Sequence, residues 1–181
     1  MKRDIVLYIG VSLDGYIARE NGDVDWLGGH GEGTEADNGY DEFYETIDTV
    51  VMGKTTYNQI INELSKDVWV YKGKKCYVAT SEKCDKNENV EFISGDIAKF
   101  VTDLKGQEGK DIWLVGGSKL VDDFIKNNLI DKYVISIIPR ILGSGIPLFL
   151  DKNPEIRLKL ISTKTVDGIV ELTYIRKKDA I

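Results

Sequence analysis

The stretch "DIWLVGGSKLVDDFIKNN", residues 111–128, decides the fold of this chain. Its first part, Ile112–Val115, is an apolar run that favours a β-strand, and Gly116 and Gly117 end it. Four apolar residues then lie on one face at helical spacing: Leu120, Val121, Phe124 and Ile125. The order of strand, glycine pair and helix is typical of a tight turn and also of a phosphate site. Glycine lets an anionic ligand approach the backbone, and the first turn of a helix offers free N–H groups.

The same alternation of strand and helix extends outward from this stretch. We predict strands over residues 4–11, 48–53, 74–80, 89–94, 111–115 and 131–139, and helices over 41–47, 54–64, 96–105 and 119–128. Such an alternation implies parallel strands joined by right-handed crossovers, whereas residues 157–178 form an antiparallel hairpin around 166–168. The polar, glycine-rich segment 12–39 is predicted to be a long functional loop or a lid. The sequence therefore predicts one α/β domain, residues 1–181, with a mixed, mainly parallel sheet and an antiparallel edge.

The composition argues against several classes of function. The 181 residues carry a formal net charge of −6 without a cluster of Lys and Arg, so nucleic-acid binding is not expected. Two cysteines, Cys76 and Cys84, and one histidine, His30, argue against a zinc site, and we expect no metal. Isolated cysteines indicate a reducing, cytoplasmic compartment. No apolar run approaches the roughly 18–20 residues that cross a bilayer, so no membrane contact is expected.

Two further predicted strands end in residues that suit a phosphate. One strand ends in Gly53 followed by Lys54 and Thr55, and another ends in Thr80, Ser81 and Lys83. Ligands of open α/β sheets bind at the carboxyl ends of the strands, so three such ends indicate a ligand with several anionic groups, for which a dinucleotide fits. The alternative is that these residues only cap helices and form turns. Neither a P-loop nor the pattern G-x-G-x-x-G is present.

Five short motifs occur in an order that resembles the dihydrofolate reductase-like superfamily. They are "VSLDGYIA" (11–18), "VVMGKTTY" (50–57), "YVATS" (77–81), "WLVGGSKL" (113–120) and "IPRILGSGIPLF" (138–149). The chain is most similar to the reductase domain at the C-terminal end of bacterial bifunctional riboflavin-biosynthesis deaminase-reductases, in its stand-alone form. The resemblance implies a three-layer sandwich around a mainly parallel eight-stranded sheet, and NADPH as the cofactor.

The resemblance also implies a role for individual residues. Gly53, Lys54 and Thr55 would meet the pyrophosphate and the adenosine side of the cofactor. Thr80, Ser81 and Lys83 would meet the adenosine 2′-phosphate. Gly116, Gly117, Ser118, Lys119 and Leu120 would wrap the pyrophosphate, and Gly10, Ile17 and Ala18 would line the nicotinamide pocket.

The expected activity is transfer of a hydride from NADPH to a C=N or C=O group of a small heterocycle, either a pteridine or a ribosylamino-pyrimidine. The reaction also needs a proton, for which Asp14 and Asp41 are the candidate catalytic residues, beside Tyr40, Tyr44 or a bound water. Asp14 has an alternative interpretation as a turn residue before Gly15. The acidic residue that binds the pterin in dihydrofolate reductases has four candidates here: Glu35, Asp37, Asp41 and Glu45.

Two other classes of function stay open at this point. The chain could be a non-catalytic NADP(H)-binding sensor or regulatory module, or a binding protein for another phosphorylated ligand. A homodimer is also compatible with the sequence, through an apolar sheet edge formed by residues 133–139 or 168–175.

Overall fold

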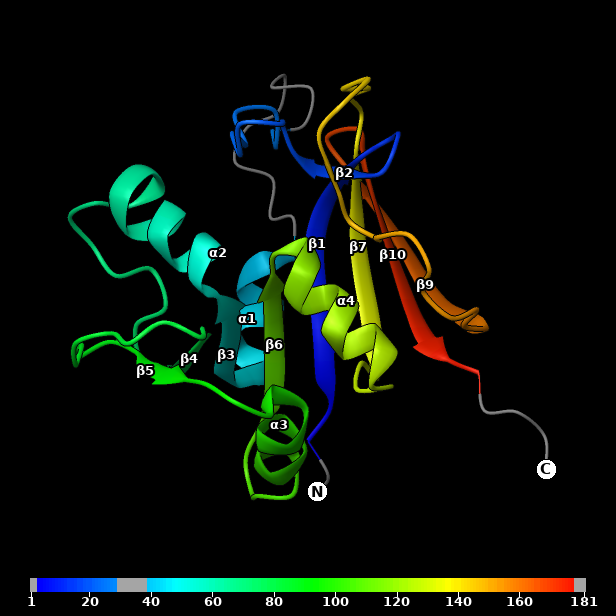
Figure 1. Ribbon diagram of the computed structural model, residues 1–181. Coiled ribbons are helices and arrows are strands. Elements are labelled where there is room, and N and C mark those ends of the chain that lie inside the picture. Colours follow the sequence, from blue (N-terminus) through cyan, green and yellow to red (C-terminus); the bar gives the residue numbers. More distant parts are fainter. Residues whose placement is uncertain (1–2, 29–38, 178–181) are drawn as a thin grey trace.

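A mixed eight-stranded sheet forms the centre of the computed structural model, which describes residues 3–28 and 39–177 (Figure 1). Its strands are β1 (Ile5–Ser12), β3 (Ile47–Gly53), β4 (Lys75–Ala79), β5 (Glu91–Ile93), β6 (Asp111–Gly116), β7 (Lys132–Ile138), β9 (Leu158–Val166) and β10 (Ile169–Arg176). Their order is β5-β4-β3-β6-β1-β7-β10-β9. The first six are parallel, and β10 and β9 are each antiparallel to their neighbour. The predicted mixed sheet with an antiparallel hairpin at its end is confirmed.

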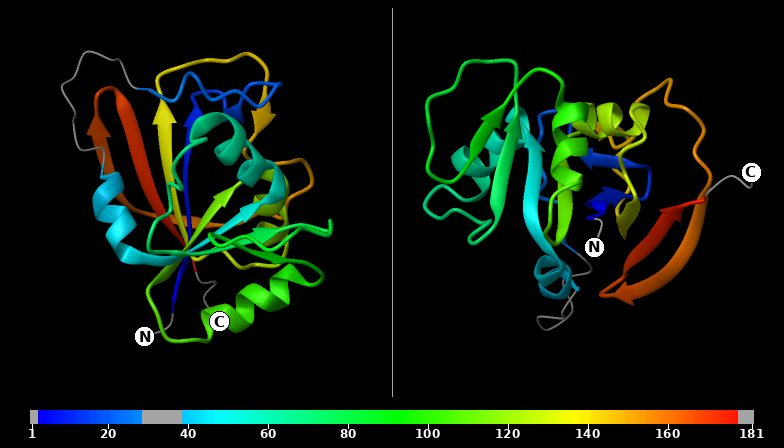
Figure 2. Two further views of the ribbon diagram at one scale, coloured as in Figure 1. Left: turned by 90° about the vertical axis from the view of Figure 1, so that its left-hand side faces the viewer. Right: turned by 90° about the horizontal axis from the view of Figure 1, so that it is seen from below.

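Helices cover both faces of this sheet, which gives the three predicted layers. They are α1 (Tyr40–Thr46), α2 (Lys54–Gln59), the π-helix η1 (Ile60–Leu64) that continues α2, α3 (Ile97–Lys105) and α4 (Ser118–Lys126). Because side chains alternate along a strand, Leu114 lies in the core with α3 and α4, and Trp113 lies in the second core with α1 and α2. In the view along the strands, α3 and α4 lie on one side of the sheet and α1 on the other (Figure 2).

Local sequence features explain where two of the helices begin and end. The side chain of Asp96 accepts a hydrogen bond from the backbone N–H of Lys99 at 2.8 Å and so caps the start of α3. Helix α1 has no basic residue in its last turn. Instead, the ammonium of Lys74 donates to the carbonyls of Tyr44 and Ile47, at 2.8 Å each, and neutralises that end of the helix.

A small second sheet lies where the sequence predicts only loops. Strand β2 (Tyr16–Ala18) pairs antiparallel with β8 (Ile146–Pro147). Both strands are too short to produce a recognisable alternation of polar and apolar residues. A Cβ atom at Gly145 would lie 2.3 Å from the carbonyl oxygen of Ala18, so only glycine fits where the two strands meet. Residues 29–38 of the predicted lid lie outside the described residues.

The predicted apolar sheet edge is wrong in its location. Strand β7 lies between β1 and β10, and β10 lies between β7 and β9, so neither 133–139 nor 168–175 forms an edge. The edge on this side of the sheet is β9. Among the described residues, no helix is both long and apolar enough to cross a membrane.

Candidate functional site

The carboxyl ends of β3, β4 and β6 meet at one level of the sheet. Met52 pairs with Gly116, and Gly53 pairs with Ala79. A Cβ atom at Gly53 would lie 3.7 Å from the carbonyl oxygen of Gly116 and 3.8 Å from the backbone nitrogen of Gly117. The peptide bond between Gly116 and Gly117 is cis. Bare backbone from two strands is therefore adjacent at the point where α2 and α4 begin, an arrangement suited to a phosphate group.

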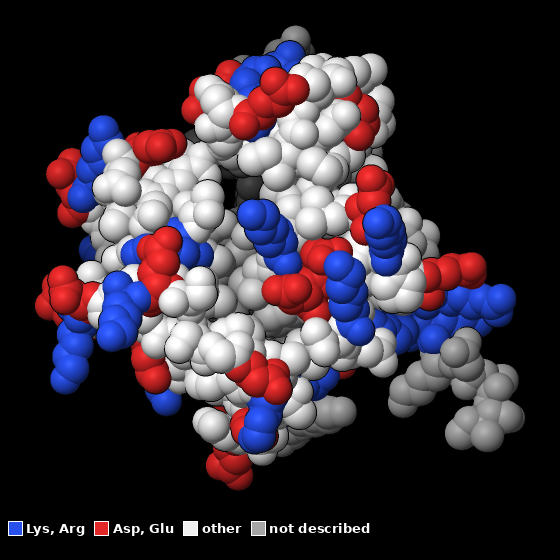
Figure 3. All heavy atoms as spheres, in the orientation of Figure 1, with Lys and Arg blue, Asp and Glu red and all other residues white. Residues whose placement is uncertain are grey.

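A hollow opens above this glycine cluster, which we define as Gly53, Gly116 and Gly117. In the space-filling view it separates α2 from the loops around β2, above the N-terminal end of α4 (Figure 3). The hydroxyl of Thr56, the second of the two threonines that follow Lys54, lies beside the cluster. Its Oγ1 atom, in the first turn of α2, is 3.4 Å from the position that a Cβ atom of Gly117 would take. The pattern of two threonines at the start of this helix already suggested hydroxyl donors for a phosphate.

The side chains of the three residues after Gly117 do not point toward a common site beside the glycine cluster. The hydroxyl of Ser118 donates to the carbonyl of Pro147 and so ties the start of α4 to β8. The side chain of Lys119 is exposed, and that of Leu120 is buried in the core. Of this predicted set, the backbone of the first turn of α4 is what faces the glycine cluster.

The residues predicted to bind the 2′-phosphate follow β4, the neighbour of β3, at the same end of the sheet as the glycine cluster. The backbone N–H of Thr80 donates to the carbonyl of Ile93 at 2.9 Å, and its hydroxyl accepts from the backbone of Glu82 at 3.1 Å. Ser81 and Lys83 are exposed, although Thr80 is half-buried. The ammonium of Lys54 lies 5.0 Å from the ring centre of Tyr57 and 4.8 Å from that of Phe92, while Thr55 is exposed.

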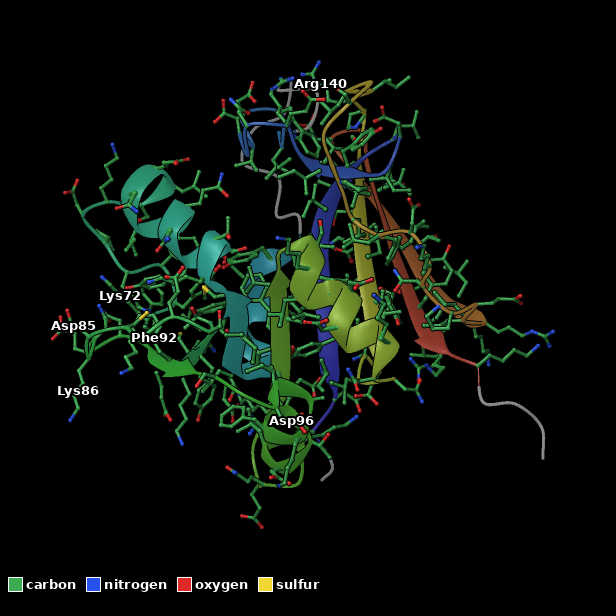
Figure 4. The ribbon with its side chains drawn as sticks, viewed as in Figure 1. Lys72, Asp85, Lys86, Phe92, Asp96 and Arg140 are labelled. Carbon is green, nitrogen blue, oxygen red and sulfur yellow. The ribbon has the colours of Figure 1, made fainter. Side chains whose placement is uncertain are left out.

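The predicted nicotinamide residues lie around the carboxyl half of β1. A Cβ atom at Gly10 would lie 3.0 Å from the end of the Leu27 side chain, so a larger residue here would require that side chain to move. Ala18 is buried, and Ile17 is half-buried. A Cβ atom at Gly116 would lie 3.7 Å from Ile9, which joins this region to the glycine cluster. Figure 4 shows the carboxyl ends of β3 and β6 between two labelled residues: Phe92 of β5 and Arg140 of the loop that follows β7.

A cavity of about 170 Å³ continues from Gly10 across the face of the sheet that carries α1. Its lining comes from β1, α1, β7, β9, β10 and the loop after β2: Tyr8, Gly10, Leu27, Tyr40, Ser136, Ile138, Lys164, Val166, Ile169 and Glu171. Its charged residues, Lys164 and Glu171, were not among the residues predicted from the sequence. Their signal was weak, because a polar residue on an alternating strand usually faces solvent.

The surroundings of Glu171 shift the pKa of its carboxyl upward. Burial raises the pKa of its carboxyl, and the negative charge of Glu42 raises that pKa further. The charge of Lys164 and the nearby hydroxyl of Tyr8 act in the opposite direction, but the net shift of the pKa is upward. A carboxyl shifted in this direction, in a cavity, is a common property of residues that bind or protonate a ligand.

The structure brings neither predicted catalytic acid into this cavity. Asp14 accepts hydrogen bonds from the hydroxyl of Ser12 at 2.6 Å and from the backbone N–H groups of Leu142 and Gly143 at 3.1 and 2.8 Å. The bond from Ser12, followed by those from Leu142 and Gly143, lowers the pKa of Asp14 and so keeps the carboxyl in its ionised form, which has no proton to donate. Its geometry corresponds to the alternative interpretation, a turn residue before Gly15, and its carboxylate also binds the backbone of the loop at Leu142 and Gly143.

Asp41 is also outside the cavity lining. It is exposed in the first turn of α1, where a negative charge stabilises the helix, and Glu45 is exposed on the same helix. Glu35, Asp37 and His30 lie outside the described residues. Tyr40 lines the cavity, whereas the hydroxyl of Tyr44 donates to the carbonyl of Lys72 at 3.2 Å. Within residues 3–28 and 39–177, no group of three or more His, Cys, Asp or Glu side chains is arranged to hold a metal ion.

Comparisons with known proteins agree with this architecture. Residues 58–171 match the family model described as the RibD C-terminal domain. The chain is 46% identical over 177 residues to the uncharacterized protein YwjB of Bacillus subtilis. The alignment covers 97% of this chain and 99% of YwjB.

Two solved structures support the fold in particular. A putative riboflavin biosynthesis protein from Shewanella sp. PV-4 superposes with a TM-score of 0.85 at 29% identity, over 97% of this chain and 99% of that one. A dihydrofolate reductase from Enterococcus faecalis, complexed with NADP(H), superposes with a TM-score of 0.69 at 16% identity, over 98% and 99%. The second likeness concerns the fold alone.

Proposed function

The chain belongs to the RibD C-terminal domain family, and from this premise we propose that it is an NADPH-dependent reductase. Its substrate would be a small heterocycle that receives a hydride at a C=N or C=O group. The observation that carries the proposal is the glycine cluster, where the backbones of Gly53, Gly116 and Gly117 adjoin without side chains. Gly116 of this cluster contacts Ile9, the residue before Gly10, which lines the cavity.

The residues at this edge fit the cofactor. The glycine cluster and the first turn of α4 would hold the pyrophosphate, because the backbone can be approached closely there. Ser81, Lys83 and Lys54 would hold the adenosine 2′-phosphate through hydroxyl and ammonium donors. Gly10 and Ala18 would leave room for the nicotinamide ring next to the cavity. When bound, NADPH supplies the hydride, and the protein supplies position, electrostatics and exclusion of water.

A homodimer is part of this proposal, with its contact moved to β9. This edge strand is exposed along most of its length, and Leu158, Leu160 and Ile161 are 37%, 48% and 50% exposed. Strand β9 is nine residues long, and its exposed apolar side chains form a surface that a second copy of the chain would cover. Light scattering after gel filtration would measure the mass, and a monomer at high micromolar concentration would contradict the dimer.

The test of the cofactor site is a titration with NADPH that follows tryptophan fluorescence in wild-type protein and in the variant Gly53→Ala. The backbone at Gly53 is extended, and the added methyl group finds only ordinary contacts at 3.7 and 3.8 Å, so the fold should tolerate it. The methyl group would nevertheless occupy the approach to the glycine cluster. Loss of a hydrogen bond to a charged group corresponds to a loss in affinity of about tenfold or more.

Gly106→Ala is the matched control, because Gly106 has a helical backbone after α3 and lies at the opposite end of the strands. We expect Gly106→Ala to bind NADPH as the wild type does, and both variants to keep their Tm. Absence of NADPH binding to the wild type at millimolar concentration would refute the reductase proposal. Equal affinity of wild type and Gly53→Ala would refute the placement of the pyrophosphate. Binding without oxidation by any substrate in a screen of pteridines and ribosylamino-pyrimidines would favour the regulatory alternative.

A further inference from the structure

One side-chain hydrogen bond joins the two walls of the hollow above the glycine cluster. These walls are α2 and the loops around β2 (Figure 3). The side-chain amide of Gln59, the last residue of α2, donates to the carbonyl oxygen of Gly22 at 2.6 Å, in the loop that follows β2. Among the described residues, no other hydrogen bond connects α2 with residues 19–28. We call the Gln59–Gly22 hydrogen bond the clasp.

The loop that carries the acceptor of the clasp is stabilised by bonds within itself. The guanidinium of Arg19 donates through Nε and Nη2 to the two carboxylate oxygens of Asp25, at 2.7 and 3.0 Å. The side chain of Asn21 donates to the carboxylate of Asp23 at 2.7 Å and accepts from its backbone N–H at 3.1 Å. Residues 19–25 therefore form a unit that can move as one body.

Both ends of this unit are fixed on the β1 side of the hollow. The residue before it, Ala18, is 6% exposed, and the residue after it, Trp26, is 5% exposed. The side chain of Leu27 extends to Gly10 of β1, where a Cβ atom would lie 3.0 Å from it. The base of the loop thus lies at β1 and its tip, Gly22, lies at α2, so the loop spans the hollow.

The charge of the loop gives it no attraction for an anionic ligand. Residues 19–25 carry the carboxylates of Glu20, Asp23 and Asp25, and their one cation, Arg19, is already paired with Asp25. A ligand with several phosphate groups is repelled by such a surface. The loop is therefore suited to control passage through the hollow and not to hold the ligand.

We propose that the clasp is a gate: it holds the loop against α2, and NADPH enters and leaves its site when the clasp opens. This inference rests on the proposed function, since NADPH is the ligand that passes. The clasp joins two groups of the protein and makes no bond to the ligand. A contact that does not distinguish the free from the bound state cannot change the affinity. The clasp therefore sets the rate constants of NADPH binding and leaves Kd unchanged.

The test is stopped-flow fluorescence with NADPH, which gives the association and dissociation rate constants. The variant Gln59→Met keeps the length of the side chain and the helix propensity but removes the donor. Gly22→Ala disturbs the acceptor, because Gly22 has φ +94°, although its added Cβ atom would meet nothing within 4 Å. The matched control is Asn58→Leu, because Asn58 is an exposed amide on the same helix.

We expect Gln59→Met and Gly22→Ala to raise both rate constants by a common factor of about two to ten, the equivalent of one hydrogen bond, at unchanged Kd. Asn58→Leu should keep the wild-type rate constants. Unchanged rate constants in Gln59→Met would overturn the inference. A rise in the dissociation rate constant alone would overturn it too, since the clasp would then stabilise the bound state instead of obstructing passage.

Hydrogen exchange without NADPH separates this inference from the proposed function. The backbone amides of residues 19–25 should exchange faster in Gln59→Met than in the wild type and in Asn58→Leu, because the loop leaves α2 more often. If exchange is faster but NADPH does not bind to the wild type, the reductase proposal fails and the clasp remains the contact that holds the loop. If NADPH binds but exchange is unchanged, the clasp fails as a gate and the cofactor site stands.

Discussion

Replacement of Arg3 by methionine should destabilise the protein strongly without changing its ligand sites. Arg3 is 3% exposed at the amino-terminal end of the sheet. Its guanidinium donates to the carbonyl of Lys110 at 2.6 Å, to that of Leu104 at 3.5 Å and to the hydroxyl of Thr49 at 2.5 Å, and it forms an ion pair with Asp48. It therefore joins the beginnings of β1, β3 and β6 to the end of α3.

The magnitude follows from what the substitution leaves behind. Breaking a buried ion pair costs about 3–5 kcal/mol, because the remaining charge keeps its desolvation penalty. Asp48 is 40% exposed and retains a hydrogen bond from the backbone of Lys110 at 2.8 Å, so part of that penalty is relieved. We therefore expect a loss of about 2–4 kcal/mol in the free energy of unfolding. For a chain of this length that corresponds to a fall in Tm of about 4–16 °C.

Differential scanning calorimetry and urea unfolding would measure this loss. Lys99→Met is the control, because the Lys99–Asp103 pair is 70% and 62% exposed and should contribute less than about 1 kcal/mol. Gly109→Ala should also lower the stability, because its Cβ atom would lie 2.6 Å from the Asp48 carboxylate and disturb the same ion pair. If Arg3→Met lowers stability no more than Lys99→Met does, the reasoning is refuted.

Two further predictions concern the ligand edge and the loops above it. Ser81→Glu should weaken NADPH at least about tenfold and leave NADH nearly unchanged, because the new carboxylate repels only the 2′-phosphate; equal losses in fluorescence titrations would contradict the assignment. Because its pKa is lowered in the folded state, Asp14 stabilises the fold above its ordinary value of 3.8. That stabilisation disappears as the pH falls through the lower folded value. The difference in Tm between wild type and Asp14→Asn should therefore be constant near neutral pH and shrink in acid, and a difference independent of pH would show that the carboxylate bonds do not contribute.

The parallel strands and the glycines at their ends were predictable, because both follow from local patterns. The alternation of apolar runs with helical spacing specifies parallel crossovers, and glycines such as Gly53 and Gly117 lie where those runs stop. The order of the strands, which was not predicted, is what brings these glycines together. The two strands of the small sheet were missed because three residues, Tyr16–Ala18, and two residues, Ile146–Pro147, are too short for periodicity.

The charged cavity was beyond the reach of the sequence for a different reason. Lys164 and Glu171 become neighbours only through the pairing of β9 with β10. Alternation identifies both strands but does not tell which face α1 covers. Asp14 illustrates the opposite error: a carboxylate in a recognised motif suggests catalysis, but its hydrogen bonds to Leu142 and Gly143 depend on a loop 128 residues away in the sequence.

The glycine cluster has a consequence for how such a protein can diverge. Because the proposed pyrophosphate site is made of main chain, exchange of the surrounding side chains leaves its hydrogen-bonding groups intact, and only the addition of a Cβ atom at a glycine would obstruct them. The cavity beside Gly10 is the reverse, since its lining includes two charged side chains of the terminal hairpin, Lys164 and Glu171. Under the proposed function, a single substitution in that hairpin would change the lining of the substrate pocket and leave the pyrophosphate site as it is. Substrate preference would then diverge one mutation at a time on an unaltered cofactor site.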